Sequence, residues 1–233
     1  MTAQPSDRPL ALVTGASRGI GRATARLLAA THDVLLGGRD VDALTALAAQ
    51  LPGARSCPVD VTDYPALAES VAGIERLDVL VHSAGVVTVA PLADIPAAEW
   101  HRVLDVNVVA VAELTRLLLP ALRAARGRVV LVNSGSGLHG RPEWGLYAAS
   151  KFALRAYADV LRDEEAAHGV RVTSVFPGRT DTDMQREVWA LESDGDYRPE
   201  RYLRVETVAE AIRYAVQAPP DAQVVDLAFR PGP

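Results

Sequence analysis

The pentapeptide YAASK places two groups that can exchange a proton four residues apart. Tyr147 and Lys151 stand at i and i+4, so a helix brings both to one face. A phenol has an ordinary pKa of about 10, and a neighbouring ammonium favours the phenolate and lowers that pKa. A tyrosine adjusted in this way gives a proton to a carbonyl oxygen or takes one from an alcohol. The same spacing also occurs on helix surfaces that do no chemistry, so the pair gains meaning only from other motifs.

A second stretch, TGASRGIG at 14–21, concentrates glycine between an apolar run and a helical segment. Gly15, Gly19 and Gly21 let a bound group approach the backbone, and a helix N-terminus offers unpaired N–H groups that bind phosphate. The spacing is G-x-x-x-G-x-G, and no Gly-Lys-Ser/Thr of a P-loop follows. The stretch therefore predicts a site for the pyrophosphate of a dinucleotide. The alternative is a tight turn that binds nothing.

The elements that position these motifs alternate along the chain. We expect strands at 10–14, 33–38, 54–60, 77–83, 127–134, 169–176 and 222–229, and helices near 19–30, 40–51, 64–74, 97–124, 146–168 and 205–217. Such alternation predicts an α/β fold: a Rossmann-like, doubly wound parallel sheet of about seven strands with helices on both faces, in three layers. One domain spans 1–233, and the charged segment 179–204 interrupts the pattern as a substrate lid.

With these motifs in this order, the chain resembles the non-extended branch of the short-chain dehydrogenase/reductase family over residues 8–229. The resemblance implies four catalytic residues: Asn107, Ser134, Tyr147 and Lys151. Ser134, in VNSGSG, would hold and polarise the substrate oxygen, with Ser136 as its rival. Asn107, in DVNVVA, would bend its helix and hold a water leading to Lys151. Inside an apolar helix it can also be an ordinary residue satisfied by a neighbour.

The second expected strand ends in LLGGRD, which bears on the choice of nicotinamide cofactor. An NAD-preferring domain has an acid there for the ribose hydroxyls, and Gly38 occupies that place. Arg39 follows, and Arg18 lies in the glycine loop, so two guanidiniums can bracket a 2′-phosphate. We therefore expect NADP(H) rather than NAD(H), unless Asp40 turns toward the ribose or both arginines are plain surface residues.

The resemblance also implies the remaining cofactor contacts. Asp60 and Val61 would contact the adenine, and Ser83 stands where the family more often has Asn. The full expected cofactor-binding set is Gly15, Ser17, Arg18, Gly19, Ile20, Gly21, Arg39, Asp60, Val61, Ser83, Ala84, Gly85, Tyr147, Lys151, Pro177, Gly178, Thr180 and Thr182.

Composition excludes several function classes. The net charge of −5 disfavours non-specific binding to nucleic acid or anionic membranes. Cys57 is the only cysteine, so no internal disulfide can form, and from the polar, proline-containing first residues we expect no signal peptide. These features predict a cytoplasmic protein. The five histidines have no metal-ligand spacing, so we expect no catalytic metal.

These observations predict an NADP(H)-dependent oxidoreductase that reduces a carbonyl compound to an alcohol, or the reverse, with Tyr147 as general acid or base. The alternatives are a non-catalytic dinucleotide sensor on the same fold, an NAD(H)-dependent alcohol dehydrogenase, and an epimerase or dehydratase with a larger C-terminal domain. The substrate is a small molecule that the sequence does not identify. Its pocket walls would come from the loop 135–146 and the insert 179–204, with His139, Trp144, Met184 and Trp189 as candidate contacts.

Two helices carry more apolar surface than one sheet face covers. In 146–168 these residues are Phe152, Ala156, Tyr157, Val160 and Leu161, and in 97–124 they are Val103, Val106, Val109, Val111, Leu114, Leu117 and Leu118. An apolar stripe wider than about 100° needs a second partner. We therefore expect a homodimer or homotetramer that pairs through these helices, unless the lid or a terminus covers them.

Overall fold

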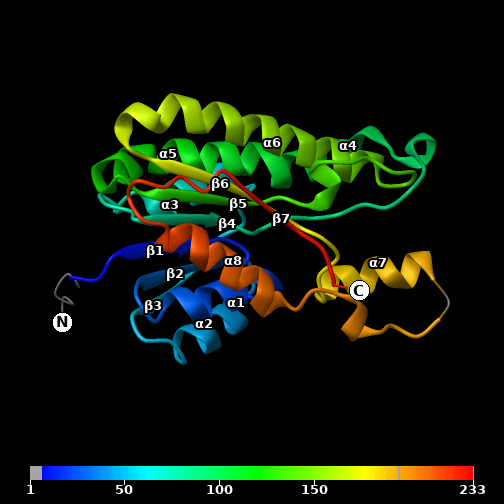
Figure 1. The fold of residues 1–233 in the computed structure, drawn as a ribbon, viewed down its shortest axis with the longest axis horizontal. Coiled ribbons are helices and arrows are strands. Elements are labelled where there is room, and N and C mark those ends of the chain that lie inside the picture. The colour runs from blue at the N-terminus through cyan, green and yellow to red at the C-terminus, as the bar shows by residue number, and fades with distance from the viewer. Residues whose placement is uncertain (1–6, 194, 233) are drawn as a thin grey trace.

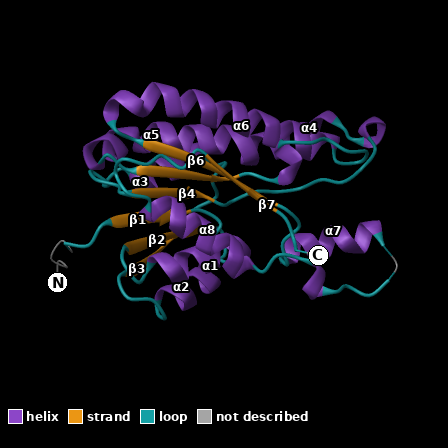
Figure 2. Cartoon of the chain, in the orientation of Figure 1, coloured by secondary structure: helices purple, strands orange, loops and turns teal. Residues whose placement is uncertain are grey.

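Short apolar runs form the strands of one parallel sheet, and the segments between them form helices on both of its faces (Figures 1 and 2). The computed structural model describes residues 7–193 and 195–232. Within them the strands are β1 Leu10–Val13, β2 Asp33–Gly38, β3 Ala54–Pro58, β4 Val79–His82, β5 Arg128–Val132, β6 Arg171–Pro177 and β7 Asp226–Phe229. Their order in the sheet is β3-β2-β1-β4-β5-β6-β7, and every neighbouring pair is parallel. The expected fold class is confirmed.

The helices divide into two layers. They are α1 Gly19–Leu28, α2 Val41–Ala48, α3 Tyr64–Val71, α4 Ala97–Leu104, α5 Ala110–Ala125, α6 Gly145–Glu165, α7 Asp183–Glu192 and α8 Val205–Gln217. One buried cluster joins the sheet to α1, α2 and α8, and a second joins it to α3, α5 and α6. Figure 1 shows these two groups of helices on opposite sides of the strands. The core is therefore split by the sheet.

The strands differ in burial according to their place in the sheet. All four residues of the central strand β4 are buried, whereas the edge strands β3 and β7 keep exposed positions. Apolar runs such as VLVH fit a strand covered on both faces, and ARSCP fits an edge.

Two segments differ from expectation. The helix predicted over 97–124 is broken into α4, a single π-helical turn at Asp105–Val109, and α5. The segment 179–204, for which no element was predicted, contains α7. Thr182 caps this helix, accepting a hydrogen bond from the Gln185 N–H at 3.1 Å, which gives a weakly periodic stretch a defined start.

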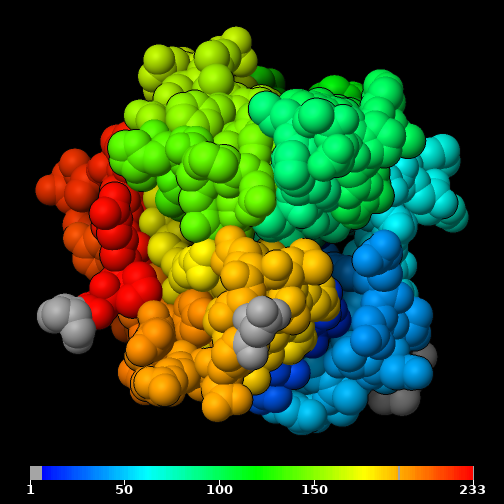
Figure 3. All heavy atoms as spheres, turned by 90° about the vertical axis from the view of Figure 1, so that its right-hand side faces the viewer, coloured from blue at the N-terminus to red at the C-terminus, as the bar shows by residue number. Residues whose placement is uncertain are grey.

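The sheet order reverses between β1 and β4, which brings the loops after these two strands together. In open α/β sheets, ligands bind at such a reversal, outside the carboxyl ends of the strands. Figure 3 faces this end of the molecule. The orange surface of the segment that carries α7 lies against the green surface of residues near 100–150 and the blue surface of the first part of the chain. Across the described ranges, no helix is both long and apolar enough to cross a membrane.

Candidate active site

The glycine loop between β1 and α1 leaves no room for a side chain at Gly15 or Gly21. A Cβ on Gly15, whose φ is +65°, would lie 2.9 Å from the Ala84 nitrogen, and one on Gly21 would lie 2.3 Å from the Gly15 oxygen. No side chain caps the N-terminus of α1, although Asp40, Asp63 and Thr182 cap α2, α3 and α7. The first N–H groups of α1 therefore remain open to an anion, as the phosphate site requires.

A threonine that the sequence analysis did not select joins this loop to its neighbour. The hydroxyl oxygen of Thr14 accepts hydrogen bonds from the N–H groups of Ser83 at 3.0 Å and Ala84 at 3.1 Å. Thr14 is 4% exposed. The loops after β1 and β4 are thus held in one arrangement, with Gly85 next in the chain. In the sequence, the signal that could have identified Thr14 is its hydroxyl at the end of the apolar run LALV.

Arg18 directly precedes α1 and Arg39 directly follows β2, and both side chains are mostly exposed. Arg39 Nη1 is 3.7 Å from Asp60 Oδ2, and Arg18 Nη1 is 3.6 Å from Asp183 Oδ2 at the start of α7. A hydrogen bond from the Thr62 N–H, together with Arg39, holds the pKa of Asp60 below its usual value. Both guanidiniums keep donors for a further anion, because each ion pair is long and exposed.

Asp40, the alternative partner for a ribose, is engaged elsewhere. Its side chain accepts a hydrogen bond from the Ala43 N–H at 3.0 Å and caps α2. Of the remaining expected contacts on this side, Ile20 packs on the core, Val61 borders a small cavity beside Thr14, and the Ser17 hydroxyl lies close to Gly38. These positions fit a dinucleotide laid across the sheet end.

Tyr147 and Lys151 lie on one face of α6, as their spacing predicts, and both are buried, at 9% and 4% exposed. The Lys151 ammonium lies 5.7 Å from the centre of the Tyr147 ring and donates to the Val132 carbonyl oxygen at 2.9 Å. This carbonyl ends β5, so the lysine is fixed between the sheet and the tyrosine.

The electrostatics of the pair differ from the sequence-based expectation. Burial raises the pKa of the Tyr147 phenol, and a hydrogen bond with Ser134 lowers it in part. Burial also lowers the pKa of Lys151 to about 8. The expected net lowering of the Tyr147 pKa is therefore wrong, because desolvation raises it. Desolvation dominates here, because neither ionised form is favoured in a site closed to water.

Asn107 lies at the centre of the π-helical turn and is 1% exposed. Its Oδ1 accepts from the Val86 N–H and its Nδ2 donates to the Val86 carbonyl oxygen, both at 2.9 Å. Its Nδ2 also donates to the Ser150 hydroxyl at 3.0 Å. Gly85 lies against it, since a Cβ there would be 3.3 Å from the Asn107 oxygen and 4.0 Å from the Lys151 ammonium. The amide thus ties the loop after β4 to α6 beside Lys151.

Asn133 is a second asparagine of the site, and the sequence analysis missed it. Its Oδ1 accepts from the Ser134 N–H at 2.9 Å, and its Nδ2 donates to the Lys151 carbonyl at 3.1 Å. It therefore sets both the start of the serine loop and the middle of α6. Ser134 accepts from the Ser136 N–H at 3.1 Å, which leaves Ser136 as a turn residue with no hydrogen bond to Tyr147.

The segment after β6 lies over the same end of the sheet. Pro177 ends the strand, and the Gly178 N–H donates to the Phe229 carbonyl at 2.8 Å. The Thr180 hydroxyl donates to the Gly178 carbonyl at 3.0 Å. The Thr182 methyl lies 3.4 Å from the position of a Cβ on Gly19. The Thr182 side chain therefore lies against the glycine loop.

α7 is joined to the catalytic helix by one carboxylate. Glu192 Oε1 accepts from the Trp144 indole at 2.9 Å and from Arg141 at 3.0 Å, and its Oε2 accepts from Arg179 at 2.5 Å. The Trp144 ring meets the Tyr147 ring edge to face, with 5.8 Å between their centres. Trp144 thus lies directly beside Tyr147, and its contact with substrate stays a prediction.

The other candidate substrate contacts lie at different places. Met184 is half-buried on α7, and Trp189 packs edge to face on Tyr197 within the insert, 5.8 Å between centres, rather than on Tyr147. His139 is exposed and borders a cavity beside the site. In the described part of the chain, no three His, Cys, Asp or Glu side chains gather where they could hold a metal.

Comparisons with known proteins agree with this fold. The model of the family described as short chain dehydrogenase matches residues 9–193. An uncharacterized short-chain type dehydrogenase/reductase of Sinorhizobium fredii is 34% identical, over 95% of this chain and 91% of its own. The glycine betaine reductase ATRR of Emericella nidulans is 36% identical over 97% of this chain, which spans only 19% of that longer protein. An alcohol dehydrogenase of Thermococcus sibiricus, solved with 5-hydroxy-NADP, is similar with a TM-score of 0.86, 29% identity and coverage of 96% of both chains.

Proposed function

This chain belongs to the short-chain dehydrogenase/reductase family of oxidoreductases, and on that premise we propose that it reduces a carbonyl compound to an alcohol, or catalyses the reverse, with NADP(H). The observation that carries the proposal is the buried phenol of Tyr147, whose pKa the Ser134 hydroxyl lowers in part and whose ring centre lies 5.7 Å from the Lys151 ammonium. A buried phenol with a hydroxyl donor such as Ser134 nearby can transfer a proton to a substrate oxygen.

Tyr147 is the general acid of the reduction. Burial keeps its pKa raised, so the phenol stays protonated at neutral pH and holds a proton for the developing alkoxide. The Ser134 hydroxyl donates to the same substrate oxygen and orients the carbonyl toward the phenol. In the reverse direction Tyr147 accepts the alcohol proton.

Lys151 and Asn107 support that transfer. The Lys151 ammonium lies in the same desolvated space, where its positive charge stabilises a phenolate far more strongly than it would in water. Its hydrogen bond to Val132 fixes its direction, and Asn107 fixes the helix beside it. These two residues thus set the position of the proton donor.

The residues present fit a nicotinamide dinucleotide. The glycines that exclude a Cβ and the uncapped start of α1 would hold its pyrophosphate, and the loop after β4 would border it. Arg18 and Arg39 would hold the 2′-phosphate of NADP(H), because no acid occupies the place of Gly38 and Asp40 caps α2. When bound, this cofactor supplies or accepts the hydride.

Part of the expected oligomer surface remains exposed. Of the twelve apolar side chains named for the two predicted helical segments, five are buried, three are half-buried and four are exposed. The exposed ones include Val109 at 48%, Phe152 at 43% and Val160 at 55%. We propose that a second copy covers them. Light scattering should then give at least twice the 24.8 kDa of one chain, and a mass of one chain would contradict the pairing. We further propose a cytoplasmic location, which suits a chain with a single cysteine.

Steady-state assays with a panel of aldehydes and ketones test the reaction. NADPH oxidation, followed by the nicotinamide absorbance, should depend on the carbonyl compound, and the alcohol product should reduce NADP. A dinucleotide sensor would bind NADPH and turn over none of the panel. A preference for NADH would instead favour the NAD(H)-dependent alternative.

A further inference from the structure

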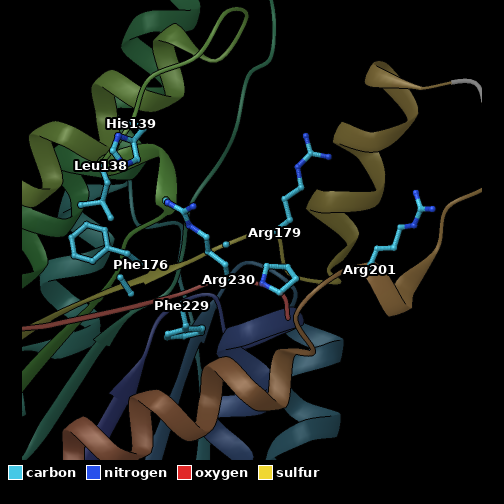
Figure 4. A pocket seen from close by; sticks show the side chains of 11 residues that line it. Leu138, His139, Phe176, Arg179, Arg201, Phe229 and Arg230 are labelled. Atoms are coloured by element: carbon cyan, nitrogen blue, oxygen red, sulfur yellow. The ribbon is translucent and has the colours of Figure 1, made fainter. Parts of the chain in front are cut away.

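A cavity of about 480 Å³ lies directly beside the candidate active site (Figure 4). Its volume falls within the range of small-molecule sites. Gly135 and Gly178 line it, and these are the residues that follow Ser134 and Pro177 in the chain. Consecutive Cα atoms are about 3.8 Å apart, so the cavity begins one residue beyond the serine proposed to hold the substrate oxygen. The cavity therefore adjoins the loop that carries Ser134.

Apolar side chains, three arginines and His139 line this cavity. Phe176, Leu138 and Phe229 supply the apolar part, and Arg179, Arg201 and Arg230 supply the charge. Figure 4 shows Leu138 and His139 on one side of the cavity and Arg179 and Arg201 on the opposite side, near α7. No Asp or Glu is among the described residues that line it. The lining of this cavity is therefore positively charged, although the net charge of the whole chain is −5.

Two of the three arginines have unused donors. Arg179 is paired with Glu192. Among the residues that the structure describes, no acidic side chain lies within the 4.0 Å of an ion pair from Arg201 or Arg230. Guanidiniums bind carboxylate and phosphate groups through parallel N–H donors, and such charge-assisted bonds are stronger than neutral ones.

From this arrangement we propose that the cavity selects substrates whose carbonyl group is joined by a short apolar segment to an anionic group, with Arg201 and Arg230 as the residues that read the anion. The proposal rests on the function proposed above, since it assigns a substrate class to the same site. The anion site and the proposed cofactor site use different arginines, because the 2′-phosphate of the cofactor is assigned to Arg18 and Arg39. Carboxylate and phosphate groups both accept the parallel N–H donors of a guanidinium, so either can be the anionic group.

Matched substrates test the proposal. The kcat/KM of unbranched aldehydes ending in a carboxylate is compared with that of their methyl esters of the same length, and a phosphate-ended series distinguishes the two anions. The full chain is assayed as wild type, R201A, R230A and the double variant. R55A is the control, since Arg55 is an exposed arginine on β3, at the opposite edge of the sheet.

The kcat/KM of the wild type should be at least about tenfold higher for the anionic aldehyde than for its ester, because KM is lower. The double variant should lose that preference. Its activity on the ester and its KM for NADPH should stay within about twofold of wild type, and R55A should behave as wild type. Equal use of acid and ester by the wild type, or an equal loss on both substrates in the double variant, would overturn the proposal.

A binding measurement separates this proposal from the function on which it rests. If none of the aldehydes reacts, calorimetry with the corresponding unreactive alkanoic acid decides the matter. Binding that R201A/R230A weakens at least about tenfold, and that R55A leaves unchanged, supports the anion site independently of catalysis. Absent binding, or the same affinity in all variants, contradicts it. Circular dichroism and thermal melting confirm that the exposed substitutions leave the fold intact.

Discussion

The Asn107 side chain exchanges two hydrogen bonds with the backbone of Val86, each 2.9 Å long. The side-chain amide pairs with the backbone of the loop after β4 in the way that a residue of an adjacent strand does. The backbone around Asn107 forms a π-helical turn. A third hydrogen bond reaches Ser150, one residue before Lys151. The irregular helix therefore aims one side chain at two parts of the site.

Replacing Asn107 with alanine should lower the free energy of unfolding by about 1–3 kcal/mol, because buried partners at Val86 and Ser150 lose their hydrogen bonds. Urea denaturation of the two proteins measures the difference. T45A, at an exposed position of α2, is the control and should stay within about 0.5 kcal/mol of wild type. An N107A protein as stable as wild type would show that water replaces these bonds without cost.

The pH dependence of reduction follows the protonation of Tyr147. Burial raises the pKa of Tyr147 and the Ser134 hydrogen bond lowers it, so removing the Ser134 hydroxyl should raise it further. Reduction uses the protonated phenol and oxidation the ionised one. In S134A both the alkaline fall of reduction and the alkaline rise of oxidation should therefore move to higher pH. The kcat/KM profiles measure this, with S136A expected to match wild type. Superimposable profiles for S134A and wild type would contradict the contact.

The carboxylate of Glu192 joins α7 to Trp144, which lies beside Tyr147. E192A should release the end of α7, speed proteolytic cleavage within 179–204, and lower kcat/KM by about tenfold, since a looser lid admits water and misplaces the substrate. E192Q keeps an acceptor for the indole and should be intermediate. E187Q, an exposed residue of the same helix, is the control. Unchanged proteolysis and kinetics in E192A would show that α7 is held by other contacts.

Cofactor choice is assigned to the guanidinium of Arg39. R39D removes a partner of the 2′-phosphate and adds an acid for the ribose hydroxyls, so the ratio of kcat/KM for NADPH over NADH should fall by at least about tenfold. R22D makes the same charge change at an exposed position of α1 and should leave the ratio within about twofold. An unmoved ratio in R39D would assign the phosphate to Arg18 alone.

The sequence predicted the sheet and the pairing of Tyr147 with Lys151 well, because apolar periodicity and helical spacing are local properties. It did not predict the π-helical turn around Asn107. That break depends on a hydrogen-bond partner, Val86, which lies 21 residues earlier in the chain. Asn133 was missed for the same reason, since its partner Lys151 lies 18 residues later on another element.

Burial was the second property that sequence patterns could not supply. The direction of the Tyr147 pKa was predicted from its neighbour Lys151, whereas desolvation by the surrounding fold determines it. The cationic cavity was also invisible, because Arg230 comes from the last residues described and Arg201 from the insert. Only the fold brings these two arginines to one cavity.

The Tyr147 hydroxyl carries the central claim, and the Y147F variant tests it most directly. Phenylalanine keeps the ring against Trp144 but removes the proton, so kcat for carbonyl reduction should fall by about 10²–10⁴-fold or more. The Kd for NADPH, measured by fluorescence titration on the same preparation, should stay within about twofold. Activity within about tenfold of wild type, with binding intact, would contradict Tyr147 as the proton donor.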